Sequence, residues 1–377
     1  MELVAMALII AAVILAQYIV YEKNGLKNVY YSFHISTSEA FEGDEIEIIE
    51  EIENAKRLPL VWVRSEISCS GQLTFKGQRQ SIGNSPEVSE DKNGEQRGLI
   101  SGIFMLRGYQ KCRRVWKVRC DRRGVMTVDN AVISVSDLLG MSKRAKTFSV
   151  TDSIRVLPVP ADMDAGRLSG DLFIGNMQVR RFVLPDPFMI SGAREYTGRE
   201  PMNRIHWAQT ARTGNLMVYN NEFTTERRMM IILNMQRSAG AYRQSMPESI
   251  LEPQIKSAAF ALDLCTKMNA ECSLAVNAET TLIIPPSEGY EHTMNVLRRL
   301  AELENMCGER MEELLSRLDF NEFTDVILIT ATVSDMIYEF LTGLNGKGKC
   351  CKIFTVGLDI DEEILTPICE TVHIPHN

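Results

Sequence analysis

The stretch Arg228-Met-Met-Ile-Ile-Leu-Asn234 is a short apolar run that leads into a polar loop. Such a run is typical of a strand that is buried on both faces of a sheet. Downstream of it, runs with strand character alternate with runs of helical period. Strands are expected at 272–276, 280–284, 325–330, 352–356 and 372–374, and helices at 248–268, 291–305, 309–318 and 335–344. This alternation predicts an α/β domain over residues 225–377, with a mostly parallel sheet covered by helices on both faces.

Upstream, residues 28–157 carry short alternating runs separated by turn residues. In 41–53 acidic residues alternate with Ile46, Ile48 and Ile52, so we expect a half-buried strand with a solvated acidic face. Further strands are expected at 60–67, 102–107, 113–119 and 130–135. The pattern predicts an all-β sandwich of the immunoglobulin-like type. Residues 77–98 are rich in Gly, Ser, Asn, Glu and Lys, which predicts a loop.

The N-terminal run Leu3–Tyr21 contains 19 residues without a charge. As a helix it is about 28 Å long, enough to span a bilayer. A secretory signal peptide is the alternative, but such peptides begin with basic residues, and here Glu2 precedes the run. The sequence therefore predicts a single-pass transmembrane anchor over residues 1–24. Lys23 and Lys27 follow the run, which favours a cytoplasmic location for everything after it.

Composition narrows the possible partners and the compartment. The chain has 377 residues, and 41 Lys and Arg against 49 Asp and Glu give a net charge of −8. Because no basic surplus is available to neutralise phosphates, nucleic acid is not an expected partner. The nine cysteines are an odd number at irregular spacings, which indicates free thiols in a reducing compartment.

Motifs for nucleotide or zinc chemistry are weak. Residues 343–348 are rich in glycine, but they follow a predicted helix and are interpreted as a helix-ending turn. Cys369, His373 and His376 have no fourth zinc ligand nearby in the sequence. We therefore expect no catalytic residues and no cofactor, although a hydrolase with a thiol nucleophile remains an open alternative.

The segment 192–218, hereafter the signature segment, contains Arg194-Glu-Tyr196, Gly198, Arg204-Ile-His-Trp207 and Thr210-Ala-Arg212 in that order. Upstream, Cys120-Asp-Arg-Arg-Gly-Val125 and Ser136-Asp-Leu-Leu-Gly-Met141 add two shorter motifs. Together these motifs resemble the domain of unknown function 58 family. The resemblance implies a membrane-anchored protein with a β-sandwich and a von Willebrand factor A-like, Rossmann-like α/β domain. It also implies a partnership with a MoxR-type AAA+ ATPase.

The signature segment lies in a connector, residues 158–224, that is locally positive in an acidic chain. Its candidate interaction or interdomain residues are Arg194, Tyr196, Arg199, Arg204, Trp207 and Arg212. In one interpretation the arginines are clamps between the two domains, with Trp207 packed beneath them. In the other they form an exposed surface for a protein partner. Gly198-Arg199 stands where the family usually has Gly-Asp, so an acidic contact of the family is absent here.

Domains of the von Willebrand factor A type commonly bind a divalent ion through Asp-x-Ser-x-Ser and a later Asp. The corresponding positions here are Asn234, Gln236 and Ser238, and Ala331 after the later strand. Both carboxylates are missing, and Mg²⁺ usually needs one or two of them. We therefore expect a degenerate site that binds no metal.

These features together predict a non-enzymatic, membrane-anchored interaction module or scaffold. By the family resemblance, it would work with a MoxR-type ATPase in the assembly or maturation of an envelope complex. An extracytoplasmic adhesion or ligand-binding module is the alternative. The two differ in the side of the membrane on which the folded domains lie.

Overall fold

The computed structural model describes residues 2–70, 74–75, 87–90, 96–162, 190–196, 202, 205–221, 227–238, 240, 243–357 and 369–374. The chain forms two compact units. The first comprises Met1–Ala161 together with Met294–Glu304, and the second comprises Asp162–Thr293 together with Asn305–Asn377.

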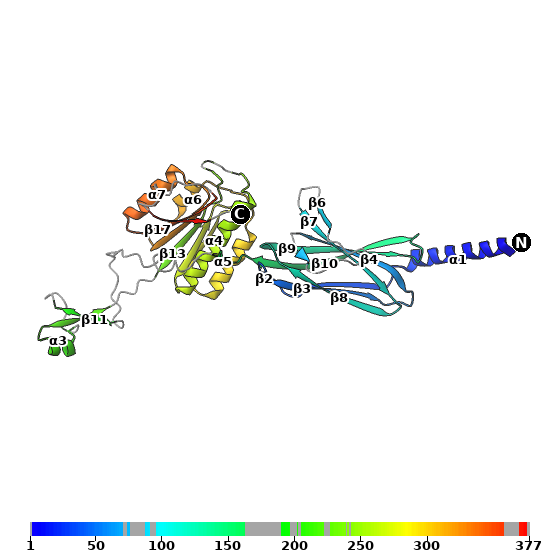
Figure 1. The fold of residues 1–377 in the computed structure, drawn as a ribbon, viewed down its shortest axis with the longest axis horizontal. Coiled ribbons are helices and arrows are strands. Elements are labelled where there is room, and N and C mark those ends of the chain that lie inside the picture. The colour runs from blue at the N-terminus through cyan, green and yellow to red at the C-terminus, as the bar shows by residue number, and fades with distance from the viewer. Residues whose placement is uncertain are drawn as a thin grey trace. The chain divides into compact units, whose positions relative to one another are not determined.

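The first unit begins with one long apolar helix, α1, Glu2–Asn24 (Figure 1). Its mean hydropathy reaches 2.7 within Leu3–Asn24, and the side chains of the most apolar part of this stretch are not packed inside the fold, whereas Tyr21 near its end is buried. The predicted apolar N-terminal helix is therefore confirmed. It is long and apolar enough to cross a membrane, a property that signal sequences share.

Two sheets follow α1. The smaller has the order β1-β3-β8-β5, formed by Val29–Ile35, Glu45–Asn54, Gln110–Arg119 and Thr74–Phe75. The larger has the order β2-β10-β9-β4-β7-β6, formed by Glu39–Phe41, Lys143–Leu157, Gly124–Ser136, Leu60–Ser70, Gln96–Leu106 and Glu87–Glu90. Ile48 and Trp116 of the smaller sheet share a buried cluster with Ile67, Ala131 and Val156 of the larger one. The predicted β-rich region is confirmed as two sheets with a common core.

Two sequence expectations for this unit are corrected. The stretch 77–98 is not only a loop, because β6 and the start of β7 pair in an antiparallel ladder from Glu87↔Leu99 to Glu90↔Gln96. Ladder hydrogen bonds between strands hold polar residues in extended form without any apolar period, so the pattern does not reveal them.

The acidic face of β3 is not wholly solvated either. Glu50 is fully buried, in phase with Ile48 and Ile52 on the inward side of the strand. Its carboxylate accepts hydrogen bonds from Tyr31 Oη at 3.2 Å and Trp116 Nε1 at 3.4 Å. Burial raises the pKa of Glu50. Because side chains of β3 alternate between the two faces of the sheet, Glu50 points into the core together with Ile48 and Ile52.

The second unit contains a sheet of order β15-β14-β13-β16-β17-β18. Its strands are Leu282–Ser287, Glu271–Val276, Arg228–Leu233, Asp325–Thr330, Cys350–Val356 and Glu370–Ile374. All neighbouring pairs are parallel except β14 and β15. The sheet is therefore mixed, with one antiparallel edge strand.

Helices α4, Glu248–Lys267, α6, Met311–Arg317, and α7, Asp335–Gly346, alternate with these strands. Helix α5, Tyr290–Glu302, follows β15 in the chain, and its residues from Met294 onward belong to the first unit. Met230 and Ile232 of β13 share a core with α6 and α7. Met229, on the opposite face of β13, lies 3.1 Å from the Cys265 sulfur of α4. Successive side chains of a strand point to opposite faces, so helices cover both sides of the sheet as predicted.

Candidate functional site

The signature segment forms a small two-stranded sheet with a helix between the strands. Strand β11, Ile190–Glu195, pairs antiparallel with β12, Met217–Asn221, so that Arg194 lies opposite Val218. Helix α3, Trp207–Thr213, fills the connection. The Tyr196 amide donates to Leu216 O, and the His206 amide donates to Met217 O, both at 2.8 Å. The predicted connector thus contains regular structure at its C-terminal end.

Several residues of the segment serve the fold of α3. His206 Nδ1 accepts the Gln209 amide at 3.2 Å and caps the start of the helix. Gly214 ends it with φ of 76°, a left-handed conformation that favours glycine. Thr210 Oγ1 accepts the Met217 amide at 3.0 Å and ties α3 to β12. The capping role of His206 was not predicted, although a polar residue directly before a helix is a capping signal.

The side chains that face outward are the candidate contact residues. Trp207 is 63% exposed, Arg212 is exposed, and α3 has no buried residue. Met202 and Leu216, which flank the helix in the sequence, are 69% and 45% exposed. Both interpretations of the arginines, as interdomain clamps and as a partner surface, stay predictions.

The other candidates of the segment are less fully defined. Tyr196 is half-buried. Arg194 is placed by its backbone in β11 only, and Arg199 and Arg204 lie outside the described residues.

The positions that were compared with a metal site from the sequence lie at the C-terminal ends of β13 and β16. Asn234 and Ala331 are buried, Gln236 is 7% exposed, and Ser238 is exposed. Asn234 Nδ2 donates to Thr330 Oγ1 at 3.0 Å, and its Oδ1 accepts the Gln236 amide at 3.0 Å. Gln236 Oε1 accepts the Met311 amide at 3.0 Å. The side-chain oxygens of Asn234 and Gln236 are therefore already used within the protein.

Asn277, at the end of β14, completes this arrangement. Its Nδ2 donates to Asn234 Oδ1 at 3.1 Å, and its Oδ1 accepts the Met235 amide at 2.6 Å. We call Asn234, Gln236, Asn277 and Thr330 the amide network. Asn277 and Thr330 were not among the predicted site residues. Both stand at the carboxyl ends of strands that are parallel to β13, where polar side chains meet.

The chemistry of the amide network is that of neutral hydrogen-bonding groups. Among the described residues there is no cluster of three His, Cys, Asp or Glu side chains that could hold a metal ion. Asn234 Oδ1 already accepts two hydrogen bonds, from the Gln236 amide and Asn277 Nδ2, and Gln236 Oε1 accepts one from the Met311 amide. The expectation that no metal binds stays a prediction, and the hydrogen bonds give it a physical reason.

Comparison with known proteins agrees with the motifs of the signature segment. A family model described as "Protein of unknown function DUF58" matches residues 192–327. These residues form a DUF58 family domain. The match begins within β11, includes α3, β12, β13 and β14, and ends within β16, before Thr330. No curated protein matches the chain.

Solved structures show partial likeness only. The CARDB domain of the PF1109 protein from Pyrococcus furiosus is 10% identical, with a TM-score of 0.22, over 35% of this chain and 96% of that one. A cohesin module from a family 33 glycoside hydrolase of Clostridium perfringens is 12% identical, with a TM-score of 0.21, over 34% and 97% of the two chains. A non-cellulosomal cohesin from Archaeoglobus fulgidus is 17% identical, with a TM-score of 0.19, over 36% and 96%. Likenesses of this size assign no function.

A thiol and an imidazole also meet in the DUF58 domain. Cys265, Cys272 and His292 line a cavity of about 440 Å³, and His292 Nε2 donates to Cys272 O at 2.7 Å. Hydrogen bonds from Cys265 and His292 lower the pKa of the Cys272 thiol. However, Cys272 is only 2% exposed, so a substrate could not reach its sulfur in this conformation.

The amide network leads to a prediction for the DUF58 domain. Addition of millimolar Mg²⁺ or Mn²⁺ is expected to leave the melting temperature of the purified chain unchanged. A metal at 100 times its dissociation constant would stabilise the folded state by about 2.7 kcal/mol, so the measurement is sensitive. A rise of several degrees that EDTA and Ser238→Ala both abolish would contradict the prediction.

Proposed function

We propose that this protein is a membrane-anchored, non-enzymatic interaction module whose signature segment binds a protein partner. The observation that carries this proposal is the exposure of Trp207 on a helix that buries none of its side chains. Tryptophan and arginine are the residues most enriched at binding hot spots. A large indole ring in water, with Arg212 exposed on the same helix, is therefore better explained by a contact than by the fold.

The surroundings of Trp207 define the chemistry of the partner surface. Met202 and Leu216 add exposed apolar area, and Arg212 adds a positive charge. The complementary surface would hold an apolar pocket for the indole ring, with an acidic side chain at its rim. An Arg and a carboxylate form two parallel hydrogen bonds, which would fix the orientation of the partner.

The architecture supports a von Willebrand factor A-like assignment for the second unit. A mixed sheet with one antiparallel edge strand and helices on both faces has the layout that such a domain requires. In this proposal the carboxyl edge of the sheet carries a degenerate metal site. At this edge the amide network, and not a cation, would supply the shape and the hydrogen bonds that a partner recognises. The two sheets of the first unit are assigned to the immunoglobulin-like type.

The resemblance to the DUF58 family suggests a MoxR-type AAA+ ATPase as the partner. Lys23 lies in the last turn of α1 and Lys27 lies just after it, which favours the cytoplasmic side for both units. ATP is available on that side, so the ATPase would supply the energy and this chain would supply recognition at the membrane. Assembly or maturation of an envelope complex is the process proposed.

Paired stability and capture measurements test this function. Trp207→Ala and Arg212→Ala are expected to change the free energy of unfolding by no more than about 0.5 kcal/mol, because both side chains are exposed. Capture of a MoxR-type ATPase on the immobilised chain should fall at least tenfold, which corresponds to about 1.4 kcal/mol.

Tyr290→Ala is the matched control, because Tyr290 is an aromatic residue of the same DUF58 domain and is 69% exposed. It should leave capture unchanged. Unaltered capture by both the Trp207 and the Arg212 variants would refute the signature segment as the docking surface.

A further inference from the structure

The end of the first unit that receives α1 is fixed to the last turns of that helix. Tyr21 is 5% exposed, and its hydroxyl donates to Pro59 O at 2.9 Å. Lys56 Nζ donates to Gly25 O at 2.7 Å and to Lys27 O at 2.6 Å. The depth at which α1 sits in a membrane therefore determines the depth of the neighbouring loops.

The turn between β9 and β10, residues 137–142, lies against α1 itself. Gln17 Nε2 donates to Asp137 Oδ2 at 3.4 Å, and Ser142 Oγ donates to Glu22 Oε2 at 2.9 Å. Gln17 precedes Tyr21, the end of the uncharged run, by four residues, or about 6 Å along the helix. The turn is thus level with the end of the apolar run and does not lie beyond it.

Three apolar side chains project outward from this turn. Leu138, Leu139 and Met141 are 53%, 57% and 63% exposed, and we call them the apolar tip. The turn that carries them is held from inside, because buried Asp137 accepts the Ser142 amide at 3.1 Å and Gly140 adopts φ of 71°. The fold therefore presents the apolar tip outward on a fixed support.

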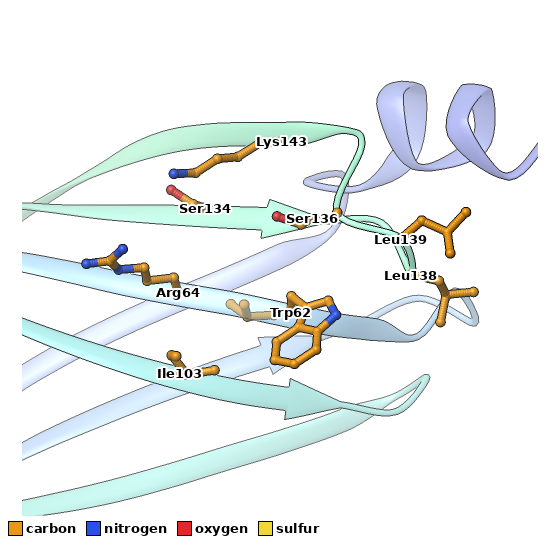
Figure 2. A pocket seen from close by; sticks show the side chains of 10 residues that line it. Trp62, Arg64, Ile103, Ser134, Ser136, Leu138, Leu139 and Lys143 are labelled. Carbon is orange, nitrogen blue, oxygen red and sulfur yellow. The ribbon is translucent and has the colours of Figure 1, made fainter. Parts of the chain in front are cut away.

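A hollow of about 470 Å³ continues from the apolar tip over the larger sheet. Figure 2 shows Leu138 and Leu139 at one end of it, near the helix, with Trp62 next to them and Arg64 and Lys143 farther along the sheet. Trp62 is 50% exposed. The hollow thus changes from apolar to cationic with distance from the helix.

The same end of the unit is basic in a protein of net charge −8. Exposed cationic side chains around it are Lys23, Lys27, Arg57, Arg107 and Lys143. Arg64 is paired with Glu66 at 3.0 Å, whereas within the described part of the chain Lys143 has no ion pair. Lysines beside a membrane span are attracted to anionic lipids of the cytoplasmic leaflet.

We propose that the apolar tip inserts into the leaflet that α1 leaves, and that the hollow binds the headgroup of an anionic phospholipid. The acyl chains would lie against Leu138 and Leu139, Trp62 at the interface, and the phosphate near Lys143. Tryptophan prefers this interfacial depth. The inference rests on the membrane anchor of the proposed function and is independent of the signature segment.

The test uses the full chain reconstituted into vesicles of phosphatidylcholine with and without phosphatidylglycerol. Lipids brominated near the top of the acyl chain should quench the fluorescence of Trp62, so the quenched share should be lost in Trp62→Phe. Leu139→Glu should reduce the quenching at least twofold. Lys143→Glu should lower the amount of phosphatidylglycerol that copurifies with the chain at least threefold. Lys117→Glu is the control, because Lys117 is an exposed lysine on β8 of the smaller sheet, and it should leave this amount unchanged.

The outcomes separate the site from the anchor. A chain that stays in the vesicles after carbonate washing but shows no Trp62 quenching would overturn the site and leave the anchor intact. Equal loss of phosphatidylglycerol in the Lys117 and Lys143 variants would show that anionic lipid is attracted by the overall charge of the chain. This result would also overturn the site. A chain that does not enter the vesicles would overturn the anchor and the site together.

Discussion

Replacement of Asn234 by Asp is expected to lower the free energy of unfolding of the second unit by roughly 2–4 kcal/mol at pH 7. Asn234 is fully buried, and its Nδ2 donates to Thr330 Oγ1. The isosteric change removes this donor and places a carboxylate in the core without a cation beside it. The measurement is chemical denaturation of the purified chain, followed by circular dichroism.

The pH dependence of this variant has a defined sign. Burial should raise the pKa of the new carboxyl in the folded state above its value in the unfolded state. The folded state then binds more protons, so the stability deficit should be small near pH 4 and grow as pH rises. Asn305→Asp, the same change at an exposed position of the second unit, is the control and should cost no more than about 0.5 kcal/mol. Parent-like stability of the Asn234 variant at pH 8 would contradict the buried amide network.

Arginine at Ile10 is expected to release the chain from membranes. Ile10 lies in the middle of the apolar run, and a charged residue at that depth costs on the order of 3 kcal/mol of insertion free energy. The variant should move from the membrane pellet to the soluble fraction after a carbonate wash, while Ile10→Leu should stay in the pellet. Continued sedimentation of Ile10→Arg would show that another part of the chain provides the attachment.

The mass of the mature protein separates an anchor from a signal sequence. An anchored chain keeps the peptide that contains Leu3–Tyr21, whereas a cleaved one loses it. Detection of this peptide in the membrane fraction is the expected result. Its absence from mature protein would reassign α1 as a signal sequence and remove the basis for a cytoplasmic location.

Features with a local period could be predicted from the sequence. The apolar run of α1, the strand at 325–330 and the helix that begins at Glu248 lie where their patterns place them. Each such pattern is a property of consecutive residues, since a helix or a buried strand must repeat its apolar positions every few residues. The order of the DUF58 motifs is also a property of the sequence, so the family domain could be recognised before the fold was known.

The candidate sites depended on contacts between residues far apart in the sequence. Nothing local reveals that Asn277 donates to Asn234, or that Glu50 lies inward between Tyr31 and Trp116. The exposure of Trp207 and of the apolar tip could not be predicted either, because a sequence pattern specifies the type of a residue but not which other residues cover it. The sequence by itself determined most of the elements and their order, and it places Asn at 234 and Ala at 331. Only the tertiary structure decided which polar groups satisfy one another and which apolar side chains remain uncovered, because burial and hydrogen-bond pairing are set by the packing of distant segments.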